Sequence, residues 1–374
     1  MIKLSNKISK NVIKRTPKSE IPNSKFATSK SEIPNSKFAA PKSEIPVSNF
    51  ADPKSKIQDP KSLRSLIFPE SYDKRIIAAV KVILAEKISN VILIKVSGKK
   101  DPPIKAQKGL TIVSVDSSKD YIEEYHSIKL KKDADRKLTV SVKELKDPLT
   151  FACMMLRNGK ADGIIAGSNY PTSQVLKNAI SLIGLKKNNK TVSSYFLLKF
   201  PKGHFLNERI MAYADCGVIP VPSAEQLSDI AIQTAENFSK LTGLKPRVAF
   251  LSYSTKGSAK DESLNRIFEA MKITKKKKPK LLIDGELQFD AAFVPEVAKR
   301  KNPKGKIKGD ANVFIFPDLN SGNIAYKITE RIGGASATGP VIQGLAKPVM
   351  DLSRGCSAED VVDMAEVLVN GIKY

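Results

Sequence analysis

The sequence predicts an α/β protein of two domains, on three observations. Most of the chain alternates short apolar runs of strand length with longer segments in which apolar residues recur at helical spacing, a pattern typical of α/β folds. Most of the short runs are continuously apolar, as expected for strands that helices cover on both faces. The length of 374 residues exceeds the roughly 250–300 residues that one core usually organises, which favours two domains.

The first 62 residues are expected to lie outside the fold as a low-complexity tail. A pattern of twelve residues that starts at Pro17 recurs from Ser29 and Pro41 and decays from Pro53. Each copy is rich in proline, serine and lysine and carries only two bulky apolar side chains, too few to offset the entropy lost on ordering. We therefore predict that residues 1–62 are disordered and that the globular part begins at Leu63.

From Leu63 onward, the period of the apolar residues predicts the elements. A helix is expected between the capping-box sequence Ser223–Gln226 and Gly243, and another from Thr172 to Gly184, because such serines start helices and glycine often ends them. The predicted strands are Val91–Val96, Thr111–Val115, Gly163–Ala166, Ser193–Leu198, Ile210–Ala214, Arg247–Leu251, Leu281–Ile283 and Asn312–Phe316.

Three polar loops follow predicted strands directly. They are Gly167–Asn169, Ser252–Thr255 and Pro317–Asp318. In open α/β sheets ligands bind outside the carboxyl ends of the strands, so these loops are expected to lie close to a binding site.

Composition restricts the class of protein. The cysteines, Cys153, Cys216 and Cys356, are few and far apart, which indicates buried thiols in a reducing, cytoplasmic setting. No apolar stretch approaches the roughly 18 residues of a membrane span. The net charge is +25, but its 52 lysines and 11 arginines are spread along the chain without an aromatic-lined stripe, so no nucleic-acid partner is expected.

Catalytic motifs are few. The two histidines, His126 and His204, lie in no nucleophile motif, which makes a carboxylate the economical candidate for a base, and no metal-ligand spacing is present. The glycine-rich segment Gly333–Gly339 follows a predicted helix. It fits either a helix C-cap and turn or a phosphate-binding loop, and the sequence leaves both open.

The segment Asp351–Asp360 concentrates polar chemistry near the C-terminus. Ser353 offers a hydroxyl, Arg354 a guanidinium and Asp360 a carboxylate within one loop and the first turn of a predicted helix. A plain structural interpretation is that Ser357 caps this helix and Asp360 completes a capping box. The alternative is a site for a phosphorylated or acyl substrate, to which Arg331 would add a second guanidinium.

Six sequence blocks carry a resemblance. They are Tyr213–Gly217, Ser223–Leu227, Leu251–Thr255, Leu282–Ala292, Asn312–Asn320 and Gln343–Pro348. In this order they resemble the phosphate acetyl/butyryltransferase family, and within it phosphate acetyltransferase. The resemblance extends from Leu138 to the C-terminus, is weaker from Leu63 to Lys137 and excludes the repeated tail.

The resemblance implies two three-layer α/β domains with a cleft between them, similar to isocitrate and isopropylmalate dehydrogenases, and usually a homodimer. The domains would be residues 63–192 with 338–374, and residues 193–337. The implied reaction is reversible: acetyl-CoA and phosphate give acetyl phosphate and CoA, with acetate kinase as the pathway neighbour. No cofactor is implied, because CoA is a substrate.

The resemblance also implies residue roles. Asp360 would deprotonate the CoA thiol, Ser353 would assist in the transition state, and Arg354 and Arg331 would contact acetyl phosphate. This agrees with physical expectation, because a thiol becomes a good nucleophile once a positioned base removes its proton. With the resemblance in hand, we expect Asp360 to act as the base while it also caps the helix.

Departures from the family pattern concern substrate binding. A CoA-side arginine of the family appears as Lys177, and the block that usually holds another reads Lys129–Arg136, where Lys131 and Arg136 are the candidates. Ser336 and Thr338, in the glycine-rich segment, are further substrate-binding candidates. The family asparagine before Asp351 is Met350, and the block after Gly167 is altered to Ser168–Pro171. Two alternatives follow: phosphate butyryltransferase, or a non-catalytic acyl-CoA-sensing domain of the same fold.

Overall fold

The computed structural model of the protein describes residues 63–187 and 189–371, which belong to one compact unit. The predicted disordered tail, residues 1–62, lies outside the described residues. The described chain forms a five-stranded and a six-stranded sheet, with helices between the strands. The predicted α/β class is confirmed.

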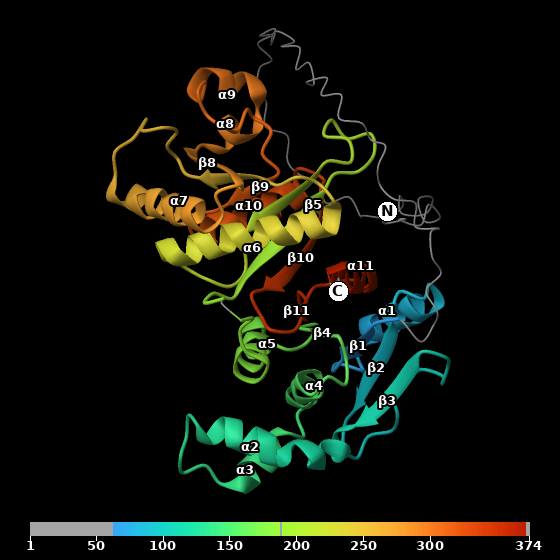
Figure 1. The fold of residues 1–374 in the computed structure, drawn as a ribbon. Coiled ribbons are helices and arrows are strands. Elements are labelled where there is room, and N and C mark those ends of the chain that lie inside the picture. The colour runs from blue at the N-terminus through green and yellow to red at the C-terminus, as the bar shows by residue number, and fades with distance from the viewer. Residues whose placement is uncertain (1–62, 188, 372–374) are drawn as a thin grey trace, which may run out of the picture. The chain divides into compact units, whose positions relative to one another are not determined.

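The first sheet has the order β11-β4-β1-β2-β3, and all its neighbouring strands are parallel. Figure 1 shows β11 and α11 (red), the last elements of the chain, returning to lie beside β4 and α1 of this sheet. Its strands are β1 (Ser65–Phe68), β2 (Asn90–Lys95), β3 (Leu110–Ser114), β4 (Gly163–Ala166) and β11 (Val349–Asp351).

The second sheet has the order β10-β5-β6-β9-β7-β8. β5 pairs antiparallel with both β10 and β6, and the remaining pairs are parallel. Its strands are β5 (Ser193–Lys199), β6 (Ile210–Ala214), β7 (Arg247–Leu251), β8 (Leu282–Leu287), β9 (Val313–Ile315) and β10 (Ser336–Gln343).

The helices follow the strands in sequence. They are α1 (Lys74–Ala85), the 3₁₀ helix η2 (Val115–Tyr121), α2 (Ile122–Leu130), α3 (Leu138–Glu144), α4 (Pro148–Arg157), α5 (Thr172–Asn178), the π-helical turn η3 (Ala179–Ile183), α6 (Ala224–Thr242), the 3₁₀ turn η4 (Glu262–Leu264), α7 (Asn265–Lys277), α8 (Phe289–Phe293), α9 (Pro295–Lys301), α10 (Leu319–Arg331) and α11 (Ala358–Gly371).

Helices cover both faces of each sheet because the strands alternate their buried side chains between two apolar clusters. In the first sheet Leu66 and Phe68 pack with α1 and α11, whereas Ile67 packs with α4 and α5. In the second sheet Phe250 packs with α6 and α7, whereas Ala249 packs with α8. α11 contacts both α1 and α6, so one apolar cluster joins the helices of the two sheets.

The predicted elements are largely confirmed. All eight predicted strands are present, the β4, β6 and β7 bounds as predicted, although β8 extends to Leu287. The predicted capping box of α6 is formed by Ser223 and Gln226, and Gly243 ends the helix in the left-handed conformation with φ of 73°. The helix predicted from Thr172 is α5, which continues into η3.

Three strands were not predicted, and each lacks the usual signal. β1 and β11 have only four and three residues. β10 is long but begins in the glycine-rich segment and contains Pro340. The register with β5 shifts between Thr338 and Val341, at an edge of the sheet, which is where a strand tolerates proline. β10 crosses the expected domain boundary after residue 337, so the two-domain division stays a proposal.

Candidate active site

The predicted catalytic segment begins where β11 ends. β11, β4 and β1 are adjacent parallel strands, so their carboxyl ends meet at one edge of the first sheet. Three turns leave this edge: residues 69–73 after β1, 167–171 after β4 and 352–357 after β11. This arrangement confirms that the predicted polar loop Gly167–Asn169 lies at a strand end.

Glu70 fixes the turn after β4 through its backbone. Its Oε2 accepts the N–H groups of Gly167 and Ser168 at 2.8 and 2.9 Å. Its Oε1 accepts those of Asn169 and Tyr170, the latter at 2.8 Å. One buried carboxylate therefore holds four successive N–H groups, which leaves the turn little freedom.

Arg75, in the first turn of α1, joins all three turns. Its guanidinium is neutralised by Asp73, to which Nη2 donates at 2.6 Å. Nη2 also donates to the carbonyl of Ser168 at 2.9 Å, and Nη1 donates to the carbonyls of Arg354 and Cys356 at 2.7 and 3.1 Å. The hydrogen bond to this guanidinium is the largest influence on Asp73 and lowers the pKa of its carboxyl to about 2.

Asp351 is the last residue of β11 and is buried, with only 1% of its surface exposed. Neither of its carboxyl oxygens accepts a hydrogen bond of normal geometry from the described residues, although the Thr172 hydroxyl lies near enough to influence it. Burial raises the pKa of Asp351 to about 6, and the neighbouring Glu70 adds to this, whereas the Thr172 hydroxyl lowers it. Sequence reasoning missed this residue, because an aspartate that ends a strand gives no signal of its burial.

The segment after Asp351 exposes the predicted catalytic side chains. Ser353 is exposed, and its Oγ accepts the N–H of Gly355 at 3.3 Å. The N–H of Ser357 donates to Asp360 Oδ2 at 2.8 Å, and the N–H of Asp360 donates to Ser357 Oγ at 3.1 Å. The predicted capping box is thus confirmed. Asp360 Oδ1 accepts no hydrogen bond from the described residues, so it can still receive a proton.

The two predicted catalytic arginines lie on different elements. Arg354 lies three residues beyond β11, and its exposed side chain makes no hydrogen bond or ion pair within the described chain. Arg331 ends α10, which packs on the second sheet; its side chain is 80% exposed and lies 3.5 Å from Glu330. Among the residues that the structure describes, Arg331 forms no hydrogen bond or ion pair with Ser353, Arg354 or Asp360.

The glycine-rich segment forms a turn and a strand. Gly334 has φ of 72° just after α10, and the chain then enters β10. Ser336 and Thr338 both lie on β10, opposite β5, and Ser336 Oγ donates to the carbonyl of Lys199 at 3.2 Å. Since a strand follows, the segment has the geometry of a helix end and turn, not of a loop at a helix N-terminus.

The cations expected to bind CoA differ in availability. Arg136 is mostly buried and forms ion pairs with Glu144 and, at 3.6 Å, with Asp133. Lys131 and Lys177 are exposed, beyond the end of α2 and on α5 respectively. Arg136 is therefore engaged within the fold, whereas the two lysines can meet a ligand.

Lys129, near the end of α2, was not singled out from the sequence. Its Nζ lies 5.0 Å from the centroid of the Tyr125 ring. Burial lowers the pKa of Lys129; the charge of Glu144 opposes this, and the charges of Arg136, Lys177 and Lys132 lower it further. The structure therefore brings these cations together from α2, the loop after it and α5, a convergence that spacing along the chain does not reveal.

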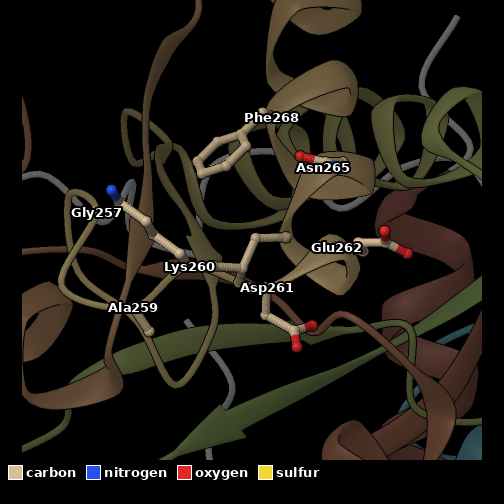
Figure 2. A pocket seen from close by; sticks show the side chains of 8 residues that line it. Gly257, Ala259, Lys260, Asp261, Glu262, Asn265 and Phe268 are labelled. Carbon is tan, nitrogen blue, oxygen red and sulfur yellow. The ribbon is translucent and has the colours of Figure 1, made fainter.

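The carboxyl edge of the second sheet is occupied by structural contacts. Ser254 Oγ, after β7, donates to the buried Glu286 at 2.8 Å, and Asp318, after β9, caps α10 by accepting the N–H of Ser321 at 2.9 Å. Figure 2 shows a pocket of about 450 Å³ near this edge, which no predicted site residue lines. It is lined by Gly257, Ala259, Lys260, Asp261, Glu262, Leu264, Asn265 and Phe268.

Cys153, Cys216 and Cys356 are free and buried, and burial raises the pKa of each thiol. Three or more side chains of metal-binding type do not gather anywhere in residues 63–187 and 189–371. In the same ranges no helix combines the length and the apolar character that crossing a membrane requires.

Comparison with known proteins identifies the family of the chain. The family described as Phosphate acetyl/butaryl transferase matches residues 54–369. The chain belongs to this family. The matched residues include both sheets and the Asp351–Asp360 segment.

Individual relatives agree with the family. The chain is 42% identical over 319 residues to a phosphate acetyltransferase from Acetivibrio thermocellus, covering 83% of this chain and 95% of the relative. It is 39% identical to one from Bacillus subtilis, covering 80% and 92%. Its structure is similar to a phosphotransacetylase from Streptococcus pyogenes, with a TM-score of 0.75 and 35% identity over 82% of this chain and 93% of the other.

Proposed function

We propose that this family member is a phosphate acetyltransferase, which moves an acetyl group reversibly between CoA and phosphate. The observation that carries the proposal is the segment Ser353–Asp360. It places an exposed hydroxyl, guanidinium and carboxylate within eight residues at the strand edge organised by Glu70 and Arg75. Its relatives by sequence include phosphate acetyltransferases that match most of the chain.

The proposed reaction is direct transfer in a ternary complex. Asp360 accepts the proton of the CoA thiol, and the thiolate attacks the carbonyl carbon of acetyl phosphate. The bond from this carbon to the bridging phosphate oxygen breaks, and phosphate leaves with the electron pair. Ser353, Arg354 and Arg331 stabilise the negative charge that develops on the carbonyl and phosphate oxygens. No covalent enzyme intermediate is required, consistent with buried thiols of raised pKa.

Cations on α2 and α5 are proposed to bind the CoA phosphates. The exposure of Lys131 and Lys177 supports this role, and Lys129 lies within electrostatic reach of Lys177. Of Lys131 and Arg136, the two candidates from the Lys129–Arg136 block, Arg136 is the weaker, because its guanidinium forms an ion pair with Glu144. Ser336 and Thr338 on β10 are retained as candidates for the phosphate side.

The wider setting is proposed from the family. We infer a cytoplasmic homodimer of two-domain subunits, acting on acetyl-CoA, CoA, phosphate and acetyl phosphate and binding neither nucleic acid nor membranes, with acetate kinase as pathway neighbour. An apolar stripe on α10 and the residue that follows it supports self-association, because Ile324, Ile328 and Ile332 are 57%, 52% and 84% exposed at helical spacing. Sedimentation of the full chain would test this, and a monomer would contradict it.

The activity is tested by release of CoA from acetyl-CoA, followed with a thiol reagent. CoA release that requires phosphate and saturates with it is expected. Release at the same rate without phosphate would indicate a thioesterase and contradict the proposal.

The closest alternative function is phosphate butyryltransferase, which differs in the acyl chain that it transfers. The turn after β4 carries Tyr170, whose hydroxyl donates to Asp147 at 2.7 Å, and Met350 is buried on β11, just before the site segment. This turn departs from the family pattern, which leaves the preferred acyl chain to be tested. Comparing rates with acetyl-CoA and butyryl-CoA separates a phosphate acetyltransferase from a phosphate butyryltransferase. Binding of either without turnover would favour the acyl-CoA-sensing alternative.

A further inference from the structure

Asp351 differs from every other buried acid in the described chain. Buried carboxyl groups there belong to Glu70, Asp215, Asp284, Glu286 and Asp351. The first four accept hydrogen bonds; Asp215, for example, accepts the N–H groups of Ser194, Gly217, Val218 and Ile219. Asp351 alone among them accepts no hydrogen bond of normal geometry on either oxygen, and the Thr172 hydroxyl is the one side-chain donor that influences it. Buried polar groups are normally satisfied, so this exception requires a physical reason.

Backbone atoms of Gly167 and Leu352 lie next to the Asp351 carboxyl. Gly167 has φ of 109°, and a Cβ there would lie 2.4 Å from Asp351 Oδ1 and 2.6 Å from the backbone nitrogen of Leu352. The N–H of Leu352 in turn donates to the carbonyl of Ala166 at 2.6 Å. The carboxyl therefore lies in the junction between the turn after β4 and the start of the catalytic segment, where it can affect both.

Among the residues that the structure describes, no positive charge is directed at this carboxyl. From the loop before α1 it faces Glu70, and from α5 it faces the Thr172 hydroxyl. β4 and its turn offer backbone at Gly167. Arg75 interacts with Glu70 but is committed to Asp73 and to three carbonyls. An ionised Asp351 would thus be a buried charge without a counter-ion and with a like charge nearby, which is strongly unfavourable.

We propose that Asp351 is a positioning residue, whose side chain must be uncharged for the segment Leu352–Ser357 to hold Ser353 and Arg354 in their working geometry. In the neutral form the carboxyl fits between Gly167 and Leu352 without a counter-charge. On ionisation it is repelled by Glu70 and draws water, which pulls the end of β11 away from the turn after β4. This inference rests on the proposed function, because it assigns Ser353 and Arg354 a role in catalysis.

The test compares an isosteric neutral variant, Asp351→Asn, with wild type across pH. Initial rates of phosphate-dependent CoA release would be measured from about pH 5 to about pH 8, where Asp351 titrates and CoA remains stable. The ratio of variant to wild-type turnover removes the titration of the CoA thiol and every other pH effect that both proteins share. The matched control is Asp162→Asn, at the opposite, amino end of β4, where the carboxylate accepts the N–H of Ser65 at 2.8 Å.

The expected result is a ratio that depends on pH. Asp351→Asn should be within about threefold of wild type at the acidic limit and exceed it by about tenfold or more at the alkaline limit, in kcat more than in KM. The control ratio should stay flat. A flat ratio for Asp351→Asn, or a uniform loss of turnover at every pH, would overturn the proposal, because either outcome means that ionisation of Asp351 does not disturb the segment.

A second measurement keeps the proposal falsifiable if the variant does not fold or the enzyme assay fails. Hydrogen exchange of the wild-type amides in Leu352–Ser357 would be compared with that of α6 across the same pH range, after correction for intrinsic rates. Protection in the segment should fall relative to α6 as pH rises; unchanged relative protection would refute the positioning role. Wild type without phosphate-dependent turnover, but with this pH-dependent exchange, would count against the proposed function and not against the role of Asp351.

Discussion

Replacing Glu70 with glutamine should destabilise the protein although the two side chains have the same shape. The backbone N–H groups of Gly167 and Ser168 share Oε2, and those of Asn169 and Tyr170 share Oε1. A carboxamide has one acceptor oxygen and one nitrogen donor, so either orientation leaves two N–H groups facing an NH₂ group. The less costly orientation loses the Asn169 and Tyr170 bonds, which are only partly buried.

The loss can be estimated from these bonds. Two donors left without acceptors, at about 1–2 kcal/mol each for partly buried groups, give about 2–4 kcal/mol. The assay is urea unfolding followed by circular dichroism, with midpoints and slopes compared between variants. Glu296→Gln is the matched control, since Glu296 is 72% exposed in a pair with Lys299 and should change stability by less than about 0.5 kcal/mol.

The two variants together decide the outcome. A Glu70→Gln protein within about 1 kcal/mol of wild type, which is the net worth of an ordinary hydrogen bond, would refute the reasoning. It would mean that water or a rearranged turn satisfies the N–H groups at little cost. Turnover of the variant should also fall, because the carbonyl of Ser168 and that of Arg354 share the guanidinium of Arg75.

Three further predictions concern the catalytic segment and CoA binding. Asp360→Asn keeps an acceptor for the Ser357 N–H and so preserves the helix cap, but turnover should fall by about 10²–10⁴-fold if Asp360 is the base; unchanged kcat in a folded variant would exclude that role. The folded-state pKa of Asp351, about 6, lies above the ordinary value of an aspartate, 3.8, so wild type should lose stability relative to Asp351→Asn as pH rises from about 4 to about 6, by about 3 kcal/mol in total. Equal pH dependence of the two unfolding curves would contradict this. Lys129→Ala should raise KM for CoA more than Lys131→Ala, because Lys129 is partly buried among other cations while Lys131 is fully solvated; equal effects, measured from initial rates, would remove Lys129 from the binding site.

Residues that act through local backbone were predictable from the sequence. The capping boxes at Ser223 and Ser357 each use two residues three positions apart, and both are formed. Continuous apolar runs such as Ile210–Ala214 became strands because a strand buried on both faces carries this pattern. Pro340 and the glycine-rich start of β10 gave no strand signal, since only the pairing with β5 makes that segment a strand.

Residues that act across the fold were not predictable in this way. Glu70 contacts a turn 97 to 100 positions away, and Arg75 reaches carbonyls 279 and 281 positions away. Arg136 was expected to bind CoA, but its ion pair with Glu144 commits it to the fold. Whether the Asp351 carboxyl accepts hydrogen bonds depends on the elements that pack around it, and no pattern within the sequence indicates this.

The sequence by itself therefore determined the α/β class, most strands and the order of the chemical groups from Ser353 to Asp360, because these depend on near neighbours along the chain. Contacts between distant elements set which charged side chains can meet a ligand and which are paired within the fold. The free energy of a buried charge depends on the groups that fold against it, and in this protein those groups come from distant strands.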